Sequence, residues 1–234
     1  MKQFVQKLFL GLFLLAILIP GVSSAQVATS VNPSGYGDRQ FDMDTIFSAK
    51  RIREDDKMYQ ISVWRRIDLR EKYNLSLYGS GDTKRNGIIN YIYKAVVDEN
   101  ALEVFGDEDF TQTLSIAEFQ ENFWLNAIGD SIFVKQLYYL DFKEDFVFDK
   151  HHSDMVFDVK YIELVMPSQT NSNAGQKTIA YIRFKDFYNY FKDHPEARWI
   201  NFKNLSQSLT YDQAFDSRLF RSVVRRFTNP DEAL

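Results

Sequence analysis

Two adjacent histidines are the residues of this chain whose types most readily suggest chemistry. His151 and His152 lie between Asp149 and Asp154 in the segment FDKHHSDM, and the third histidine, His194, stands far along the chain next to a proline. A structural or catalytic metal site needs three or four ligands that converge on one point. Neighbouring side chains in a turn diverge, so the pattern indicates a solvated hairpin tip and no metal site.

Other catalytic patterns are missing from the sequence. The chain has no cysteine, which excludes thiol nucleophiles, cysteine zinc sites and disulfides. It has no G-x-S-x-G motif, and GSGDTKRNG (79–87) lacks the spacing of a phosphate-binding loop. Glu144 and Asp145 are adjacent acids, and a glycosidase needs two carboxylates, but 32 acidic residues leave the choice of a pair open. We therefore predict no catalytic residue and no cofactor.

The first segment is typical of an export signal. Two lysines precede an apolar run over Leu8–Ile19, and small residues lead to Ala25, so we expect cleavage near Ala25–Gln26. The apolar run is short for a membrane span, which disfavours an uncleaved anchor. Because residues 1–25 hold two lysines and no acid, their loss moves the net charge from −4 to −6. An acidic chain is a poor binder of nucleic acid.

The middle of the chain predicts a β-hairpin. Apolar residues alternate with charged ones on both sides of 150–153, which we take as the turn. A single register places every apolar residue on one face. It pairs Asp149 with Asp154, Phe148 with Met155, Phe146 with Phe157, Asp145 with Asp158, Lys143 with Lys160 and Phe142 with Tyr161. We expect a third strand over 178–184 and a short helix directly after it.

Several other segments have helical patterns. Apolar residues at helical spacing predict a helix over 86–100, and the capping-box spelling Ser115-x-x-Glu118 predicts one over 115–127. The segment 55–78 stays open, because its length favours a helix whereas its alternating aliphatic residues suit a strand. A second capping-box spelling at 210–213 begins a predicted closing helix with a stripe of arginines on one face.

Together these elements predict one α+β domain. An antiparallel sheet built on the hairpin, with about three or more strands, is covered by several helices. We assign residues 1–25 to the signal, 26–45 to a flexible polar arm, 46–230 to the globular domain and 231–234 to a tail.

Two arginine-rich regions are the candidate interfaces. Arginine and tryptophan are enriched where proteins bind each other. Their alternative role is structural, since nearby acids neutralise arginines on an ordinary protein surface. The six candidate residues are Trp64, Arg66, Arg70, Arg218, Arg221 and Arg225.

Three long stretches resemble the GldN/PorN family. They read VWRRIDLREKYNLSLY (63–78), LDFKEDFVFDKHHSDMVFDVKYIELVMP (140–167) and TYDQAFDSRLFRSVVRRFTNP (210–230). They occur in the family's order, and Phe146 stands where the family usually has tryptophan. The similarity covers about residues 46–230.

This resemblance implies a non-enzymatic, periplasmic structural subunit. Members of the family belong to the type IX secretion and gliding motility machinery, where they form a ring with the outer-membrane lipoprotein GldK/PorK and contact the periplasmic domain of GldM/PorM. The residues alone leave an alternative, a module that binds peptidoglycan or another carbohydrate through tryptophans such as Trp124 and Trp199. Stoichiometry, ring symmetry and the surface that meets each partner do not follow from the sequence.

Overall fold

The computed structural model describes residues 52–78, 87–200 and 208–228, all within one compact unit. The signal segment 1–25, the arm 26–45, most of 79–87 and the tail 231–234 lie outside these residues.

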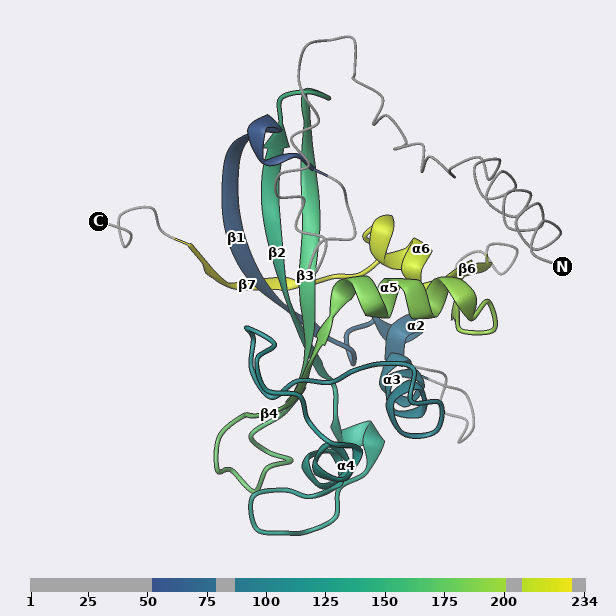
Figure 1. Cartoon of the computed structure of the whole chain (residues 1–234). Helices are drawn as coiled ribbons and strands as arrows, with labels where there is room; N and C mark the ends of the chain where they lie inside the picture. Colours follow the sequence, from purple (N-terminus) through teal and green to yellow (C-terminus); the bar gives the residue numbers. More distant parts are fainter. Residues whose placement is uncertain (1–51, 79–86, 201–207, 229–234) are drawn as a thin grey trace, which may run out of the picture. The chain divides into compact units, whose positions relative to one another are not determined.

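The predicted α+β class is confirmed: the described strands form an antiparallel sheet in the order β4-β3-β2-β1-β7 and a small pair β5-β6, accompanied by helices (Figure 1). The elements are η1 (Glu54–Asp56), β1 (Lys57–Asp68), α2 (Leu75–Tyr78), α3 (Ile88–Val97), α4 (Ile116–Trp124), η2 (Val134–Gln136), β2 (Tyr139–Asp149), β3 (Asp154–Met166), β4 (Lys177–Arg183), α5 (Phe184–Asp193), β5 (Arg198–Ile200), β6 (Ser208–Thr210), α6 (Tyr211–Asp216) and β7 (Val223–Phe227).

The open segment 55–78 is mainly a strand. β1 has 12 residues and pairs with β2 along its length and with β7 near its end. Length did not distinguish a helix from a strand here, because β2 and β3 have similar lengths of 11 and 13 residues. The alternation of aliphatic residues was the better guide, since a strand between two neighbours contributes side chains to both faces of the sheet.

The predicted hairpin is confirmed in its outer half and corrected in its inner half. Asp149 faces Asp154, Phe146 faces Phe157, and Asp145 faces Asp158, as expected. A bulge between Lys143 and Glu144 then shifts the register, so that Lys143 faces Tyr161 and Phe142 faces Ile162. The bulge separates Lys143 from Lys160, and the latter instead lies 2.9 Å from Asp158 and 3.7 Å from Asp145. The shift thus avoids the unfavourable lysine pair.

The apolar core lies at the inner half of this sheet, against the helices. Leu140, Phe142 and Ile162 are at most 1% exposed, whereas Phe146 and Phe157, further along the same face, are only half-buried. In Figure 1 the outer ends of β1, β2 and β3 extend past the helices, which explains this difference. The sheet therefore has a covered inner half and an outer half whose apolar face is partly exposed.

The predicted helices of the central region are confirmed. α3 buries the expected stripe of aliphatic residues, and α4 begins with the predicted capping box, in which Glu118 accepts from the Ser115 N–H at 2.8 Å and the Ser115 hydroxyl accepts from the Glu118 N–H at 3.3 Å. α5 follows β4 directly and buries Phe187 and Phe191, which contact each other at 4.5 Å between ring centroids. The aromatic residues thus form the core that the composition indicated.

The predicted closing helix was wrong beyond its first turns. α6 ends at Asp216, Arg218 has a positive φ of 50°, and the chain continues as β7. A left-handed residue cannot continue an α-helix, and the β-branched pair Val223-Val224 favours a strand. The arginines at 218, 221 and 225 therefore do not share a helix face.

Candidate protein-interaction surface

The two candidate regions, far apart in the sequence, meet in the structure. β7 pairs with the end of β1, so that Val223 faces Arg66 and Arg226 faces Trp64. The buried side chain of Asn74 strengthens this junction: its amide donates to the carbonyls of Asp68 and Arg221, and its carbonyl accepts from the Arg221 N–H at 2.8 Å. The surface around β1 and β7 is thus one continuous region built from both ends of the described chain.

Trp64 has a structural environment within this region. Its indole N–H donates to the Tyr161 hydroxyl at 3.0 Å, and that hydroxyl donates to Glu108 at 2.7 Å. Lys143 lies 4.9 Å and Arg226 3.8 Å from the indole ring, within the range of cation–π attraction. Burial, followed by the Glu108 hydrogen bond, raises the pKa of Tyr161, which keeps the hydroxyl protonated as the donor. These contacts fix the ring against the sheet.

Arg66 and Arg70 differ in their exposure. The Arg66 guanidinium is buried and makes two hydrogen bonds of 2.6 Å to Asp141, a bidentate pair. Arg70 is exposed; it pairs with Asp68 at 2.8 Å and stacks 3.4 Å from the centre of the Tyr138 ring. Arg66 therefore acts within the fold, whereas Arg70 presents a partly neutralised cation to the outside.

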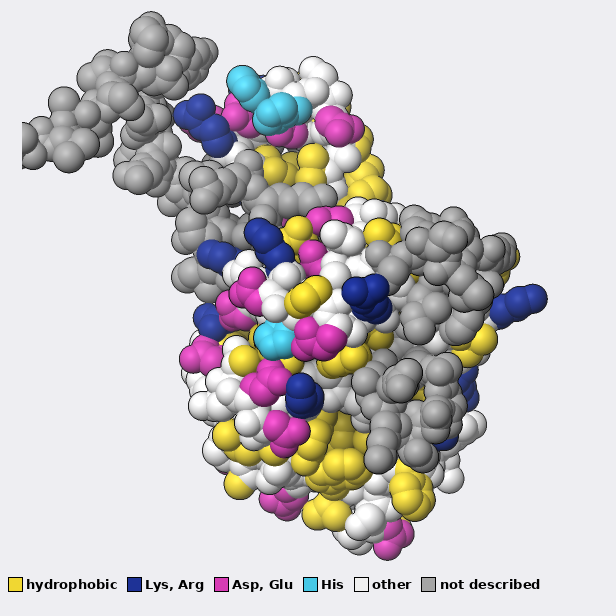
Figure 2. Space-filling view, turned by 90° about the vertical axis from the view of Figure 1, so that its right-hand side faces the viewer, with side chains coloured by type: hydrophobic (Ala, Val, Ile, Leu, Met, Phe, Trp, Pro, Cys, Tyr) yellow, Lys and Arg dark blue, Asp and Glu magenta, His cyan; other side chains and the backbone are white. Residues whose placement is uncertain are grey.

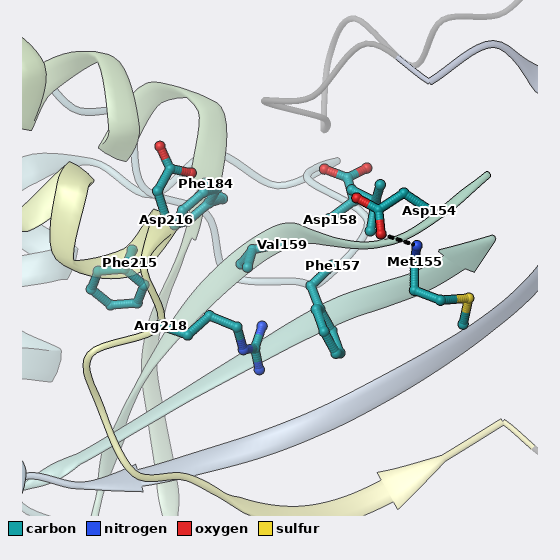
Figure 3. A pocket seen from close by; sticks show the side chains of 10 residues that line it. Asp154, Met155, Phe157, Asp158, Val159, Phe184, Phe215, Asp216 and Arg218 are labelled. Carbon is teal, nitrogen blue, oxygen red and sulfur yellow. Dashed lines mark hydrogen bonds between the residues drawn. The ribbon is translucent and has the colours of Figure 1, made fainter. Parts of the chain in front are cut away.

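Arg218 is held by a buried carboxylate. Its guanidinium donates to Glu144 at 2.6 Å and 3.1 Å, and Arg65 donates to the same carboxylate at 2.5 Å. Glu144 has no exposed side-chain surface, whereas the two arginines keep 22% and 29% of theirs. Figure 3 shows the Arg218 side chain directed toward Phe157, whose ring centre is 4.1 Å away. This cluster attaches the turn after α6 to the sheet and so directs β7 toward β1.

Arg221 and Arg225 are the more accessible members of the set. Arg221 keeps 63% of its side-chain surface and lies 3.6 Å from Glu71. Arg225 is exposed on β7 and has no partner position on β1, since it is the extra residue of a bulge. We define the β1–β7 surface as Arg70, Arg221 and Arg225 together with the exposed apolar residues Val223, Val224 and Phe227.

Sequence reasoning missed the apolar part of this surface and the buried acid beneath it. In the predicted closing helix, Val223 and Phe227 would share an apolar face with Phe215 and Leu219, but they are 56% and 59% exposed on the strand. The β-branched residues Val223 and Val224 did favour a strand at this position. No local pattern marked Glu144, because its role depends on a bulge and on an arginine 74 residues away.

The histidine pair lies at an exposed tip, as expected. Figure 2 shows histidine side chains beside acidic ones at one end of the molecule. His152 Nδ1 lies 2.6 Å from Asp149, whose carboxylate also accepts from the backbone N–H groups of His151 and His152. The Asp149 hydrogen bond and charge raise the pKa of His152, and the same bond lowers that of Asp149. Within the described residues, no three His, Asp or Glu side chains are placed to hold a metal ion.

The other two tryptophans are packed into the molecule. Trp199 is 7% exposed, and Trp124 donates to the Tyr93 hydroxyl at 3.0 Å while its ring contacts Phe123 edge-on. They therefore anchor the core. Among the described helices, none has the length and apolar character that a membrane crossing requires.

Comparison with known proteins gives one family. No curated protein matched the chain. The family described as gliding motility associated protein GldN matches residues 52–234, which is well over half of the chain and includes β1, the hairpin and β7. The chain therefore belongs to the GldN family of gliding motility associated proteins.

Proposed function

We propose that this protein is a non-enzymatic, periplasmic structural subunit of the type IX secretion and gliding motility machinery. In this proposal it forms a ring with an outer-membrane lipoprotein of the GldK/PorK type and contacts the periplasmic domain of a GldM/PorM-type protein. Family membership supports the connection to gliding motility. The proposed export signal at residues 1–25 supports a location beyond the inner membrane.

The observation that carries the binding role is the β1–β7 surface. It combines three exposed arginines with exposed Val223, Val224 and Phe227, whose fractions of accessible surface are 56%, 45% and 59%. Val223 and Val224 pair with successive residues of β1 and therefore project to opposite faces of the sheet, so a partner would cover the exposed edge strand from both sides. Apolar residues interspersed with arginines are typical of surfaces that another protein covers. We propose that the lipoprotein binds here and that its carboxylates meet Arg221 and Arg225.

The structure determines which arginines suit a charge-reversal test. Arg218 is bonded to buried Glu144, so its reversal would disturb the fold itself. Arg221 and Arg225 are exposed, and their replacement by glutamate leaves the Glu144 cluster in place. The variant R221E/R225E is therefore the appropriate probe.

The experiment is co-purification of the chain with a tagged lipoprotein partner. We expect R221E/R225E to lose most of the partner while its melting temperature stays near that of the unmodified chain. The matched control is K192E/R198E, which reverses two exposed charges on α5 and β5, away from β7. Equal recovery of the lipoprotein by both variants would refute this surface as the binding site.

A sedimentation assay with purified peptidoglycan separates this proposal from the carbohydrate-binding alternative. We expect the isolated chain to stay in solution. Sedimentation without any protein partner would favour a cell-wall binding module instead.

A further inference from the structure

The outer half of β3 has an open edge beside a pocket. β4 pairs with β3 only from Tyr161 to Met166, so within the described residues Asp154–Lys160 has a strand neighbour on one side only, β2. Asp154–Phe157, the first part of this segment, is exposed or half-buried. An open strand edge carries unpaired backbone N–H and C=O groups and readily accepts a further strand.

The pocket next to this edge can accept apolar side chains. It has a volume of about 150 Å³, and its lining includes Phe157 and Val159 of β3 together with Phe184 and Phe215. Figure 3 shows these aromatic rings around the opening, with Arg218 reaching toward Phe157. An added strand would therefore gain apolar contact at the pocket and backbone hydrogen bonds at the edge, where it would displace the Asp154 carboxylate that accepts from the Met155 N–H at 2.7 Å.

The free charge along this edge is negative. Asp154 and Asp216 line the pocket and are exposed, and within the described residues neither makes an ion pair. Arg218, the one basic residue that the described part of the chain contributes to the lining, is already bonded to Glu144 through two of its nitrogens. The chemistry of the edge and pocket therefore favours an extended strand that is both apolar and basic.

β7 has this composition and forms the opposite edge of the same sheet. Its sequence is VVRRF, all five residues are exposed, and β1 is its one neighbour among the described strands. Arg225, the bulge residue, makes no ion pair within the described chain. β7 thus offers two valines, a phenylalanine and a free cation to a strand edge that presents apolar residues and aspartate.

The strand directions are also compatible. Neighbouring strands from β3 to β7 are all antiparallel, so β7 runs opposite to β3 within one molecule. A second copy in the same orientation would present its β7 antiparallel to β3, as a continuous antiparallel sheet requires. Each copy would use one β3 edge and one β7 edge, a heterologous contact that can repeat from copy to copy.

We propose that the β3 edge at Asp154–Phe157 binds β7 of a second copy of this chain. The inference goes beyond the proposed function, because it concerns contact between copies. It uses β7, which is also part of the β1–β7 surface, so a copy whose β7 is paired with β3 offers the lipoprotein only Arg70 and Arg221 of that surface. Its test uses the purified chain alone, so its failure would leave the partner proposal standing.

Cysteine cross-linking provides the test, because the chain has no cysteine of its own. Met155→Cys and Val224→Cys would be prepared as separate variants, mixed and treated with a short thiol cross-linker. Both positions are partly exposed, at 38% and 45%, and they lie on the two edges. We expect cross-linked dimers in the mixture and few with either variant alone. The control mixes Met155→Cys with Ile128→Cys, which lies outside the sheet and is 70% exposed.

Charge exchange makes the test specific. Adding Asp154→Arg to the Met155→Cys chain should lower the yield of cross-linked dimer about fivefold, since the attraction between Asp154 and Arg225 of the second copy becomes a repulsion. Adding Arg225→Asp to the Val224→Cys chain should then restore it. A yield no higher than the Ile128 control would overturn the proposal, as would predominant dimers of Val224→Cys alone.

Discussion

The substitution Arg218→Gln tests whether the cluster at Glu144 holds the end of the chain in place. It removes a cation that donates to Glu144 at 2.6 Å and 3.1 Å, and Glu144 itself has no exposed side-chain surface. Breaking a buried ion pair costs about 3–5 kcal/mol. Because Arg218 is 29% exposed and Arg65 still neutralises the carboxylate, we expect the lower end, about 3 kcal/mol.

Thermal unfolding of the purified chain measures this effect. For a domain of this size, about 1 kcal/mol corresponds to a shift of about 2–4 °C, so Arg218→Gln should lower the melting temperature by roughly 6–12 °C. Arg225→Gln, on the exposed strand, should shift it by less than about 2 °C.

A double-mutant cycle with Glu144→Gln identifies the cause of the change. In that background, Arg218→Gln should cost less, because the carboxylate that it bonds is gone. Equal melting temperatures for Arg218→Gln and Arg225→Gln, or an unchanged effect in the Glu144→Gln background, would refute the structural role of the pair.

Three further predictions test other parts of the fold. Ser115→Ala removes the hydroxyl of the capping box and should destabilise the chain by about 1 kcal/mol, visible as a lower denaturation midpoint; an unchanged midpoint would contradict the role of the cap. Phe187→Ala empties a fully buried site and should cost about 3–5 kcal/mol in the same assay, whereas a loss below about 1 kcal/mol would show that the core is assigned incorrectly. Asp149→Asn should lower the pKa of His152 toward 6.5, as followed by NMR titration. Because Asp149 raises the pKa of His152 in the folded state, the pair stabilises the fold below about pH 6.5, and this stabilisation is lost as the pH rises through the folded-state pKa of His152. An unaltered His152 titration in Asp149→Asn would exclude Asp149 as the cause of the raised pKa.

The hairpin and the central helices could be predicted because their signals are local. The turn at 150–153 and the alternating residues beside it specify one register for the outer hairpin, and Ser115 with Glu118 marks the beginning of α4. The bulge at Lys143 could not be predicted, because it depends on which side chains the neighbouring strands bring opposite each other. Local patterns therefore determined the elements, but they did not determine the whole register.

The errors concern β1 and β7, whose structure depends on distant partners. The alternating residues of 55–78 also fit helical faces, and pairing with β2 decides for the strand. Phe215, Leu219 and Phe220 have helical spacing, but Arg218 leaves the helix and bonds to Glu144, 74 residues away. The six interface candidates were chosen by residue type, and burial separates them: Arg66 pairs inside the fold, whereas Arg221 and Arg225 stay accessible. Which of these arginines is exposed follows only from the complete sheet.

Hydrogen–deuterium exchange with and without the lipoprotein partner tests the central claim most directly. The claim is that the β1–β7 surface is covered when the machinery assembles. We predict slower exchange at the backbone amides of 221–228 on addition of the partner, and no change in α5, which lies elsewhere in the fold. Unchanged exchange at 221–228, with protection confined to other segments, would contradict the account.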